Sequence, residues 1–341
     1  MNFDDVSKLR NAYELLKNIN IKTLVIYSKT SVEINEIPLD NDNCIYISSN
    51  EITKNVSNID KYIKKYKNVK EVITIGAGTA TDIGKYIAYK LNIKITSIIT
   101  MLSTNVYATD KVALIVNGRK ETLLAKMPDL IIVDETIMKR AIKYNLYGLA
   151  DVFSIWTALK DWDIAFEDGK DVIDEKIYSK SKRLLNKTIK FVLNSSYEDI
   201  CNKQEEIFYL IGEAGYITNL YGTGRPESGS EHLFAKEIEG LMDMPHAIAV
   251  ANGIILMSLI QKYYNKKILE CLNKLNLYEE SYKLGVNFEL INTALNNVKV
   301  RKDRYTVMNR VIDDNDYKQE QMEKFKKLVG DYYNVNSKWF F

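Results

Sequence analysis

The chain contains two histidines among its 341 residues, His232 and His246, and both lie in the stretch "GTGRPESGSEHLFAKEIEGLMDMPHAIAVANG". Neutral imidazole is a common ligand of divalent metals, and a catalytic metal site needs about three protein ligands with one position left open. Fourteen positions separate the two residues, which is too far for one helix face. We therefore expect the histidines at the start of one helix and at the turn or start of the next, with "DMP" at the break.

A carboxylate must complete such a set, and the residue types alone leave several aspartates open. Asp151 in "GLADVFSIWTALKDW" is the best candidate, because it lies in an otherwise apolar helical start where an unpaired charge is costly. The alternative for the histidines is an ordinary packing role. We favour a metal site because both histidines lie in segments of small residues, where the backbone can approach a bound group.

A second candidate site lies in "EVITIGAGTATDIGKYIA", where Gly76, Ala77, Gly78 and Thr79 connect an apolar strand to an amphipathic helix. Small residues at such a turn let backbone N–H groups and the positive end of the helix approach a phosphate. The alternative is a tight connection without a ligand, since Thr81 occupies the third glycine position of a dinucleotide fingerprint. The residues leave both interpretations open.

Two regions of different character must position these sites. Over the first 140 residues the β-branched runs "KTLVIYS", "CIYIS", "EVITIG", "ITSIIT" and "DLIIVD" alternate with helical patterns, which predicts a mostly parallel sheet covered on both faces. Asn117-Gly118 between two further β-like runs predicts a hairpin. Long helical periodicities follow from about Tyr144. We expect a nucleotide-binding α/β domain over residues 1–143, an all-helical domain over 144–341 that carries the metal ligands, and an active site in the cleft between them.

Composition argues against several classes of partner. The net charge of +2, with 27% charged residues, indicates no nucleic-acid surface, and no apolar run approaches the roughly 20 residues of a membrane span. Three widely spaced cysteines indicate a reducing compartment and no thiolate metal site. We expect a cytoplasmic protein. The final "NSKWFF" favours a packed tail or a contact with another subunit, which is compatible with a homo-oligomer.

Five strings resemble, in order, the glycerol-1-phosphate dehydrogenase branch of the iron-containing alcohol dehydrogenase, glycerol dehydrogenase and dehydroquinate synthase superfamily. They are "GAGTATDIGKYIA", "GLADVFSIWTALKDW", "GTGRPESGSEHLF", "PHAIAVANG" and "RKDRYTVMNRV", and the resemblance runs from about residue 20 to residue 315. It implies a dehydroquinate synthase-like fold, NAD(H) or NADP(H) as cofactor, and one divalent metal, with zinc favoured over iron. The metal ligands of the family match Asp151, His232 and His246.

The resemblance also implies cofactor residues and shows one departure. The family's "G-G-G-T-x-x-D-x-x-K" and "T-x-x-S-x-D" segments match Gly76, Ala77, Gly78, Thr79, Asp82, Thr100 and Ser103. Ala77 replaces a family glycine, which is tolerated if its φ is negative. Asn105 replaces an aspartate that faces the substrate hydroxyls, so it is a catalytic candidate beside the metal ligands. A neutral amide there should ease the entry of an anionic substrate.

The function that the resemblance implies is a metal-dependent, NAD(P)-linked oxidoreductase acting on a small molecule. It would interconvert a polyol phosphate and its ketone, with sn-glycerol 1-phosphate and dihydroxyacetone phosphate as first candidates. The alternatives are a dehydrogenase of glycerol or another alcohol, a dehydroquinate synthase-like cyclase, and a nucleotide-binding protein in which the histidines only pack. Arg225 suits either a substrate phosphate or loop carbonyls, and "RKDRYT" (301–306) favours internal salt bridges.

Overall fold

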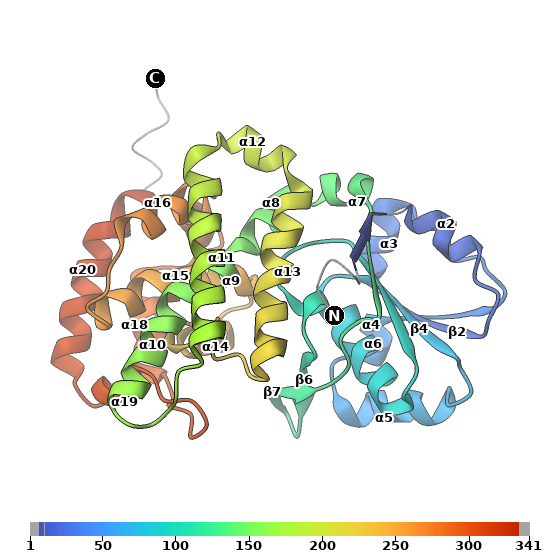
Figure 1. The fold of residues 1–341 in the computed structure, drawn as a ribbon, viewed down its shortest axis with the longest axis horizontal. Coiled ribbons are helices and arrows are strands. Elements are labelled where there is room, and N and C mark those ends of the chain that lie inside the picture. Colours follow the sequence, from blue (N-terminus) through green and yellow to red (C-terminus); the bar gives the residue numbers. More distant parts are fainter. Residues whose placement is uncertain (1–6, 10, 334–341) are drawn as a thin grey trace. The chain divides into compact units, whose positions relative to one another are not determined.

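The computed structural model describes residues 7–9 and 11–333, which form two compact units. The first is an α/β unit of the residues up to Asn145 together with Gln204–Tyr216, and the second is a helical unit of Leu146–Lys203 and the residues from Ile217 onward (Figure 1). The domains predicted from the sequence, 1–143 and 144–341, differ from this division in the place of Gln204–Tyr216 and by two residues at the boundary, which lies after Asn145. "NSKWFF" lies outside the described residues.

The α/β unit is built on a parallel sheet of six strands in the order β1-β8-β5-β4-β2-β3. The strands are β1 (Ser7–Leu9), β2 (Thr23–Tyr27), β3 (Cys44–Ser48), β4 (Glu71–Gly76), β5 (Lys94–Ile99) and β8 (Leu130–Val133). The central strands are buried almost throughout, because valine and isoleucine suit a sheet covered on both faces. The predicted parallel sheet is confirmed. Strand β1 was not predicted, since its three residues contain no β-branched side chain.

An antiparallel hairpin of β6 (Lys111–Val116) and β7 (Arg119–Leu124) stands apart from the main sheet. Asn117 and Gly118 form its two-residue turn, with φ values of 49° and 78°. Both values are positive, as the favoured hairpin turns require, and asparagine and glycine adopt them most readily. The hairpin that the sequence predicted is confirmed.

Helices cover the sheet of the α/β unit, and α6 packs against β2, β4 and β5. The helices of this unit are α2 (Ala12–Lys17), α3 (Lys29–Asn35), α4 (Ser49–Ile52), α5 (Val56–Lys65), α6 (Gly78–Leu91), the 3₁₀ helix η1 (Val106–Ala108) and α7 (Glu135–Arg140). Two further helices, α8 (Ile142–Tyr147) and α13 (Gln204–Tyr221), contain residues of both units.

The second unit is all-helical in its described part, as predicted. Its helices are α9 (Leu149–Phe153), α10 (Ile155–Glu167), α11 (Glu175–Asn194), α12 (Tyr197–Asn202), α14 (Ser230–Leu241), α15 (His246–Ile260), α16 (Lys266–Lys274), α17 (Leu277–Lys283), α18 (Phe288–Asn297), α19 (Met308–Val311) and α20 (Asn315–Tyr333). Helix α15 is buried at every position after His246, which its apolar sequence explains, and α14 packs along it. Among the described helices, none combines the length and the apolar character that crossing a membrane requires.

Candidate metal centre and cofactor turn

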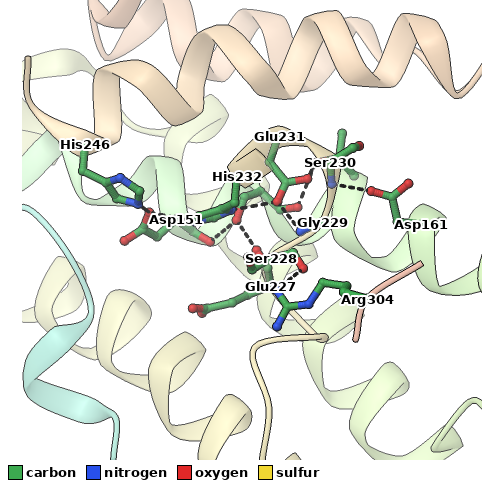
Figure 2. A network of polar contacts seen from close by, with 12 residues as sticks. Asp151, Asp161, Glu227, Ser228, Gly229, Ser230, Glu231, His232, His246 and Arg304 are labelled. Atoms are coloured by element: carbon green, nitrogen blue, oxygen red, sulfur yellow. Dashed lines mark hydrogen bonds and ion pairs between the residues drawn. The ribbon is translucent and has the colours of Figure 1, made fainter. Parts of the chain in front are cut away.

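Asp151, His232 and His246 lie together in the helical unit, with their side chains directed toward one another (Figure 2). Asp151 belongs to α9, His232 is the third residue of α14, and His246 is the first residue of α15. The Nε2 atom of each histidine lies 3.9 Å from Oδ1 of Asp151, and the three ligand atoms lie within 4.8 Å of one another. The predicted placement of both histidines at helix starts is confirmed.

The carboxylate of Asp151 supports a bound cation. Its Oδ1 atom is buried and has no hydrogen-bond partner in the described chain, and the residue as a whole is 3% exposed. A buried carboxylate oxygen without a partner is costly, and a cation would remove that cost. One carboxylate oxygen and two imidazole nitrogens are donors that suit zinc or ferrous iron. The three residues therefore fit a single divalent ion.

A glutamate of α14 holds the other ring nitrogen of each histidine. Nδ1 of His232 lies 2.8 Å from Oε1 of Glu231, and Nδ1 of His246 contacts Oε1 of Glu239. A carboxylate at Nδ1 fixes the ring orientation and keeps the proton on that nitrogen, so that Nε2 retains its lone pair. Both rings are thus oriented as ligands by the protein itself.

Glu231 is held in place from three directions. Its Oε1 atom also accepts the Gly229 N–H at 2.6 Å, and its Oε2 atom accepts the Thr157 hydroxyl at 2.7 Å. Burial lowers the pKa of His232, but the hydrogen bond and the charge of Glu231 outweigh it, so the net pKa lies above the ordinary 6.5. Glu231 is therefore a fixed hydrogen-bond partner against which the ring of His232 is oriented.

Asp161 of α10 joins the start of α14 to a distant segment. Its Oδ2 atom accepts the Ser230 N–H at 2.6 Å, and its Oδ1 atom accepts the Val307 N–H at 2.7 Å. Burial, together with the charge of Glu231, raises the pKa of Asp161 to about 6. Helix α14 gains from Asp161 the cap that its N-cap residue Gly229 lacks.

Two glycines allow the close packing on which the cluster depends. A Cβ atom at Gly229 would lie 2.4 Å from Oδ2 of Asp161, and a Cβ atom at Gly253 would lie 2.7 Å from the backbone oxygen of Glu231. Because Gly253 belongs to α15, its missing side chain lets α15 pack directly on the backbone of α14. The small residues around the histidines thus serve close contact between the two helices that carry them.

Arg225 and the pair of Arg301 and Asp303 have structural partners. Arg225 donates from Nη1 to the backbone oxygen of Tyr305 at 2.6 Å, and its Nε lies 2.9 Å from Oδ2 of Asp171. It therefore holds a loop carbonyl, which is one of the two roles predicted for it. Arg301 and Asp303 form the internal ion pair that was predicted for their segment.

Arg304 departs from that prediction. Its Nη1 atom donates to the backbone oxygen of Ser228 at 2.8 Å, and it makes no ion pair with any residue that the structure describes. The predicted internal salt bridge is therefore wrong for this residue. The reason is that Asp303, its neighbour in sequence, is already bound through both oxygens by Arg301.

The glycine turn lies at the carboxyl ends of β4 and β2, in the α/β unit. Strand β2 pairs with β3 on one side and with β4 on the other, and open α/β sheets bind ligands where the strand order reverses in this way. Gly76 has a φ of 155°, and a Cβ atom there would lie 3.0 Å from the Cβ of Ala80. Ala77 has a φ of −100°, so the condition for tolerating alanine is met.

Helix α6 begins at Gly78 with its first backbone N–H groups uncapped, since Ala77 at the N-cap makes no side-chain hydrogen bond. A Cβ atom at Gly78 would meet nothing within 4 Å. Gly78 is half-buried and Thr79 is exposed. The turn therefore offers accessible N–H donors at the positive end of a helix, which is the arrangement that suits an anion.

The other residues predicted to bind the cofactor follow β5 or lie on α6. The Thr100 N–H donates to the backbone oxygen of Gly76 at 3.2 Å, and Ser103 follows half-buried in the same loop. Asp82 is buried on α6, where its Oδ2 atom lies 2.7 Å from Nζ of Lys54. The roles of these residues toward a cofactor stay predictions.

Asn105 precedes η1 in a segment that Lys85 holds in place. Lys85 of α6 is fully buried, and its ammonium group donates to the backbone oxygens of Val106 and Lys111, each at 2.7 Å. Burial lowers the pKa of Lys85 to about 8. The amine thus anchors the loop on both sides of η1.

The residues that orient the metal ligands or anchor the neighbouring loops were not predicted from the sequence. Asp161 carries the same signal as Asp151, a carboxylate in an apolar helical segment, ten positions further on. Glu231 and Lys85 stand inside the strings that were singled out, but nothing in the strings indicates what they contact. No signal in the sequence distinguishes Glu239 from the other glutamates.

Known proteins resemble this chain over most of its length. The sequence profile of the iron-containing alcohol dehydrogenase family matches residues 14–141. Glycerol-1-phosphate dehydrogenase (NAD(P)+) from Methanococcus maripaludis is 31% identical over 318 residues, which cover 86% of this chain and 89% of the relative. The enzyme of the same name from Thermococcus kodakarensis is 26% identical over 322 residues, covering 91% and 90%.

Solved structures share the fold at lower sequence identity. Glycerol dehydrogenase from Schizosaccharomyces pombe has a TM-score of 0.66 at 14% identity, covering 94% of this chain and 86% of that chain. A probable glycerol dehydrogenase from Sinorhizobium meliloti has a TM-score of 0.68 at 14% identity, covering 95% and 96%. The predicted fold class, an α/β sheet unit with an all-α unit, is thereby confirmed.

Proposed function

Because this chain belongs to the iron-containing alcohol dehydrogenase family, we propose that it is a metal-dependent, NAD(P)-linked oxidoreductase that interconverts sn-glycerol 1-phosphate and dihydroxyacetone phosphate. The observation that carries the proposal is the convergence of Asp151, His232 and His246, each presenting one ligand atom within 4.8 Å of the others. The substrate is taken from the relatives, which are named glycerol-1-phosphate dehydrogenases and match most of the chain.

We propose that these three residues hold one divalent ion, zinc in preference to iron. The partnerless Oδ1 of Asp151 and the two oriented Nε2 atoms support the ion. When bound, such an ion supplies Lewis-acid polarisation of the substrate's carbonyl oxygen. Hydride transfer to or from nicotinamide requires no change in the metal's oxidation state. Zinc, which has no redox chemistry, is therefore sufficient.

The chain's own residues prepare the site for that chemistry. Glu231 and Glu239 keep the protons on Nδ1 of the two rings, and Asp161 fixes the start of the helix that carries His232. Reduction of a ketone also consumes a proton, and the chain has no third histidine to deliver it. The proton must come from water, from a substrate hydroxyl, or from a lysine, tyrosine or aspartate side chain.

For the cofactor we propose the turn from Gly76 to Thr79, with the pyrophosphate of NAD(H) or NADP(H) at the first N–H groups of α6. The uncapped helix start, the open space at Gly78 and the reversal of strand order between β2 and β4 support this placement. We further propose that Thr100 and Ser103 bind the cofactor and that Asn105 contacts the substrate.

Initial rates of nicotinamide oxidation test the proposal. Zinc-loaded protein should reduce dihydroxyacetone phosphate with a kcat/KM about 100-fold higher than that for dihydroxyacetone, and the product should be sn-glycerol 1-phosphate. Asn105→Asp should change the ratio of the two kcat/KM values by about tenfold, because it places a negative charge where an anionic substrate enters. Faster reduction of the unphosphorylated ketone or of a simple aldehyde would exclude the glycerol-1-phosphate assignment and leave an alcohol dehydrogenase.

Metal content tests the choice of ion. Elemental analysis of purified protein should find one zinc per chain, and chelator-treated protein should regain activity with zinc. Recovery with ferrous iron alone would reverse the preference.

A further inference from the structure

Arg304 has unused hydrogen-bonding capacity beside the metal cluster. A guanidinium group carries five N–H donors in a planar fork, and the structure gives Arg304 one acceptor within the described chain, the backbone oxygen of Ser228 at 2.8 Å from Nη1. Arg225 and Arg301, the other two arginines in the same part of the unit, each pair with an aspartate. Arg304 is the member of this group whose charge is left without an ion-pair partner.

Two acids, Asp303 and Glu231, act on the charge of Arg304, and both are bound by other groups. Asp303 receives two hydrogen bonds from Arg301, at 2.9 Å and 2.5 Å. Glu231 is occupied by the ring of His232, the Gly229 N–H and the Thr157 hydroxyl. Burial, together with the positive charges of Arg301 and Arg225, lowers the pKa of Arg304 to about 10. Asp303 and Glu231 act on the charge of Arg304 without being bound to it, so its guanidinium has no ion-pair partner among the described residues.

The backbone on the C-terminal side of Arg304 is fixed relative to the metal ligands. The Tyr305 backbone oxygen accepts from Arg225, and the Val307 N–H binds Asp161, which also holds Ser230, two residues before His232. Figure 2 shows Arg304 beside Ser228 and Gly229, in the same polar network as Asp151 and His232. A guanidinium anchored in this way is already oriented before a ligand arrives, so little entropy is lost on binding.

We propose that Arg304 binds the phosphate group of the substrate. The inference rests on the proposed function, in which the substrate is a phosphorylated three-carbon ketone. Arginine forms paired N–H···O bonds with phosphate oxygens, and these bonds are stronger than those between neutral groups. The alternative is that Arg304 only braces the Ser228 carbonyl, in which case its loss would affect phosphorylated and unphosphorylated substrates alike.

Arg304→Met tests the proposal, because methionine retains much of the apolar stem and removes the fork. The kcat/KM for dihydroxyacetone phosphate should fall about 100-fold, whereas that for dihydroxyacetone should fall less than about fivefold. Lys302→Met is the matched control from the same segment, since Lys302 is exposed and its substitution leaves the pair of Arg301 and Asp303 in place. It should leave both values within about twofold. Equal losses on both substrates in Arg304→Met would overturn the proposal in favour of the brace.

A binding measurement keeps the inference testable apart from activity. Calorimetric titration of metal-free, full-length protein, saturated with NADH so that the turn at the start of α6 is occupied, with inorganic phosphate should show binding by the wild type and by Lys302→Met, and at least tenfold weaker binding by Arg304→Met. If Arg304→Met does not fold, Arg304→Lys replaces it, because lysine keeps the charge and loses the paired geometry. Undiminished phosphate binding in the variant that folds would overturn the proposal. Failure of the wild type to prefer dihydroxyacetone phosphate would instead count against the proposed function.

Discussion

The candidate cofactor turn and the candidate metal cluster place their polar groups by different means. The turn uses backbone N–H groups of consecutive residues, and its shape follows from Gly76 and from the point where α6 begins. The cluster uses three side chains, and the first and last of them, Asp151 and His246, are 95 positions apart in the sequence. Each histidine is oriented by a glutamate, and the start of α14 is held by Asp161.

This difference predicts how many properties of the protein a substitution in each site should change. A change in the turn should act on one ligand or on local backbone strain, because few other residues share its groups. A change in the cluster should affect metal binding, activity and helix packing together, because the ligands depend on partners from α10, α14 and α15. Five substitutions test this contrast.

His232→Ala should have the largest effect. Removing one of three protein ligands should abolish stoichiometric metal binding and lower kcat/KM at least about 1,000-fold, since Lewis-acid polarisation supplies several kcal/mol of transition-state stabilisation. Circular dichroism should show a folded protein. Elemental analysis and initial rates are the measurements, with chelator-treated wild type as the control. A metal-free His232→Ala protein with full activity would falsify the mechanism.

Gly78→Val should raise the KM for the nicotinamide cofactor about 100-fold through a clash with the pyrophosphate. The free energy of unfolding should change by less than about 1 kcal/mol, because a Cβ atom at Gly78 meets nothing within 4 Å. Gly76→Ala should act on stability more than on the KM. It should lower the free energy of unfolding by about 1–3 kcal/mol, since φ is 155° and the new Cβ atom would lie 3.0 Å from the Cβ of Ala80. An unchanged KM in Gly78→Val would place the nucleotide elsewhere.

Asp161 should make stability depend on pH. Its pKa is about 6 in the folded protein against an ordinary 3.8. A carboxyl whose pKa is raised on folding binds more protons when folded, so its contribution to the free energy of unfolding falls as the pH rises from about 4 to 6. The fall should be on the order of 2–3 kcal/mol.

Urea unfolding of metal-free protein at pH 4.5 and pH 7 measures this effect. Asp161→Asn cannot ionise, so it should lose less stability than the wild type over the same interval, and the other titrating groups cancel in the comparison. Parallel behaviour of the two proteins would show that the carboxyl is already ionised at pH 4.5.

Glu239→Gln should have the smallest effect of the five. The amide oxygen of the variant can still accept a hydrogen bond from Nδ1 of His246. It lacks the negative charge that makes Nε2 of the ring a stronger metal ligand, so metal affinity should fall about tenfold. Competition with a chromophoric chelator measures this affinity. Glu237→Gln on the same helix is the control and should leave it unchanged. Equal affinities in both variants would limit Glu239 to a packing role.

The turn and the ligand set could be predicted from the sequence for different reasons. Gly76 to Thr79 follow a β-branched run and precede a helical pattern, so the local chain contains the whole site. The ligands were predicted because histidine is scarce in this chain and because Asp151 interrupts an apolar helical start. In both cases the signal lies in residue types that are unusual for their surroundings.

The supporting contacts could not be predicted, because they depend on where distant segments meet. Asp161 accepts from Val307, 146 positions away, and no local pattern indicates that pairing. Glu239 orients His246 from the preceding helix, and only the packing of α14 on α15 brings the two together. Strand β1 was missed for a related reason, since its place beside β8 is set by the sheet and not by its own three residues.

The contact between Asp161 and Val307 has a consequence for the order in which the protein is made. Closing a loop of this length carries an entropic cost, so contacts so far apart in sequence form late in folding. During synthesis, Asp161, which caps the start of α14, cannot gain its second backbone partner until Val307 has left the ribosome, although both histidines have emerged long before. A nascent chain or a peptide spanning residues 222–253 should therefore bind zinc far more weakly than the finished protein, and metal loading should follow chain synthesis.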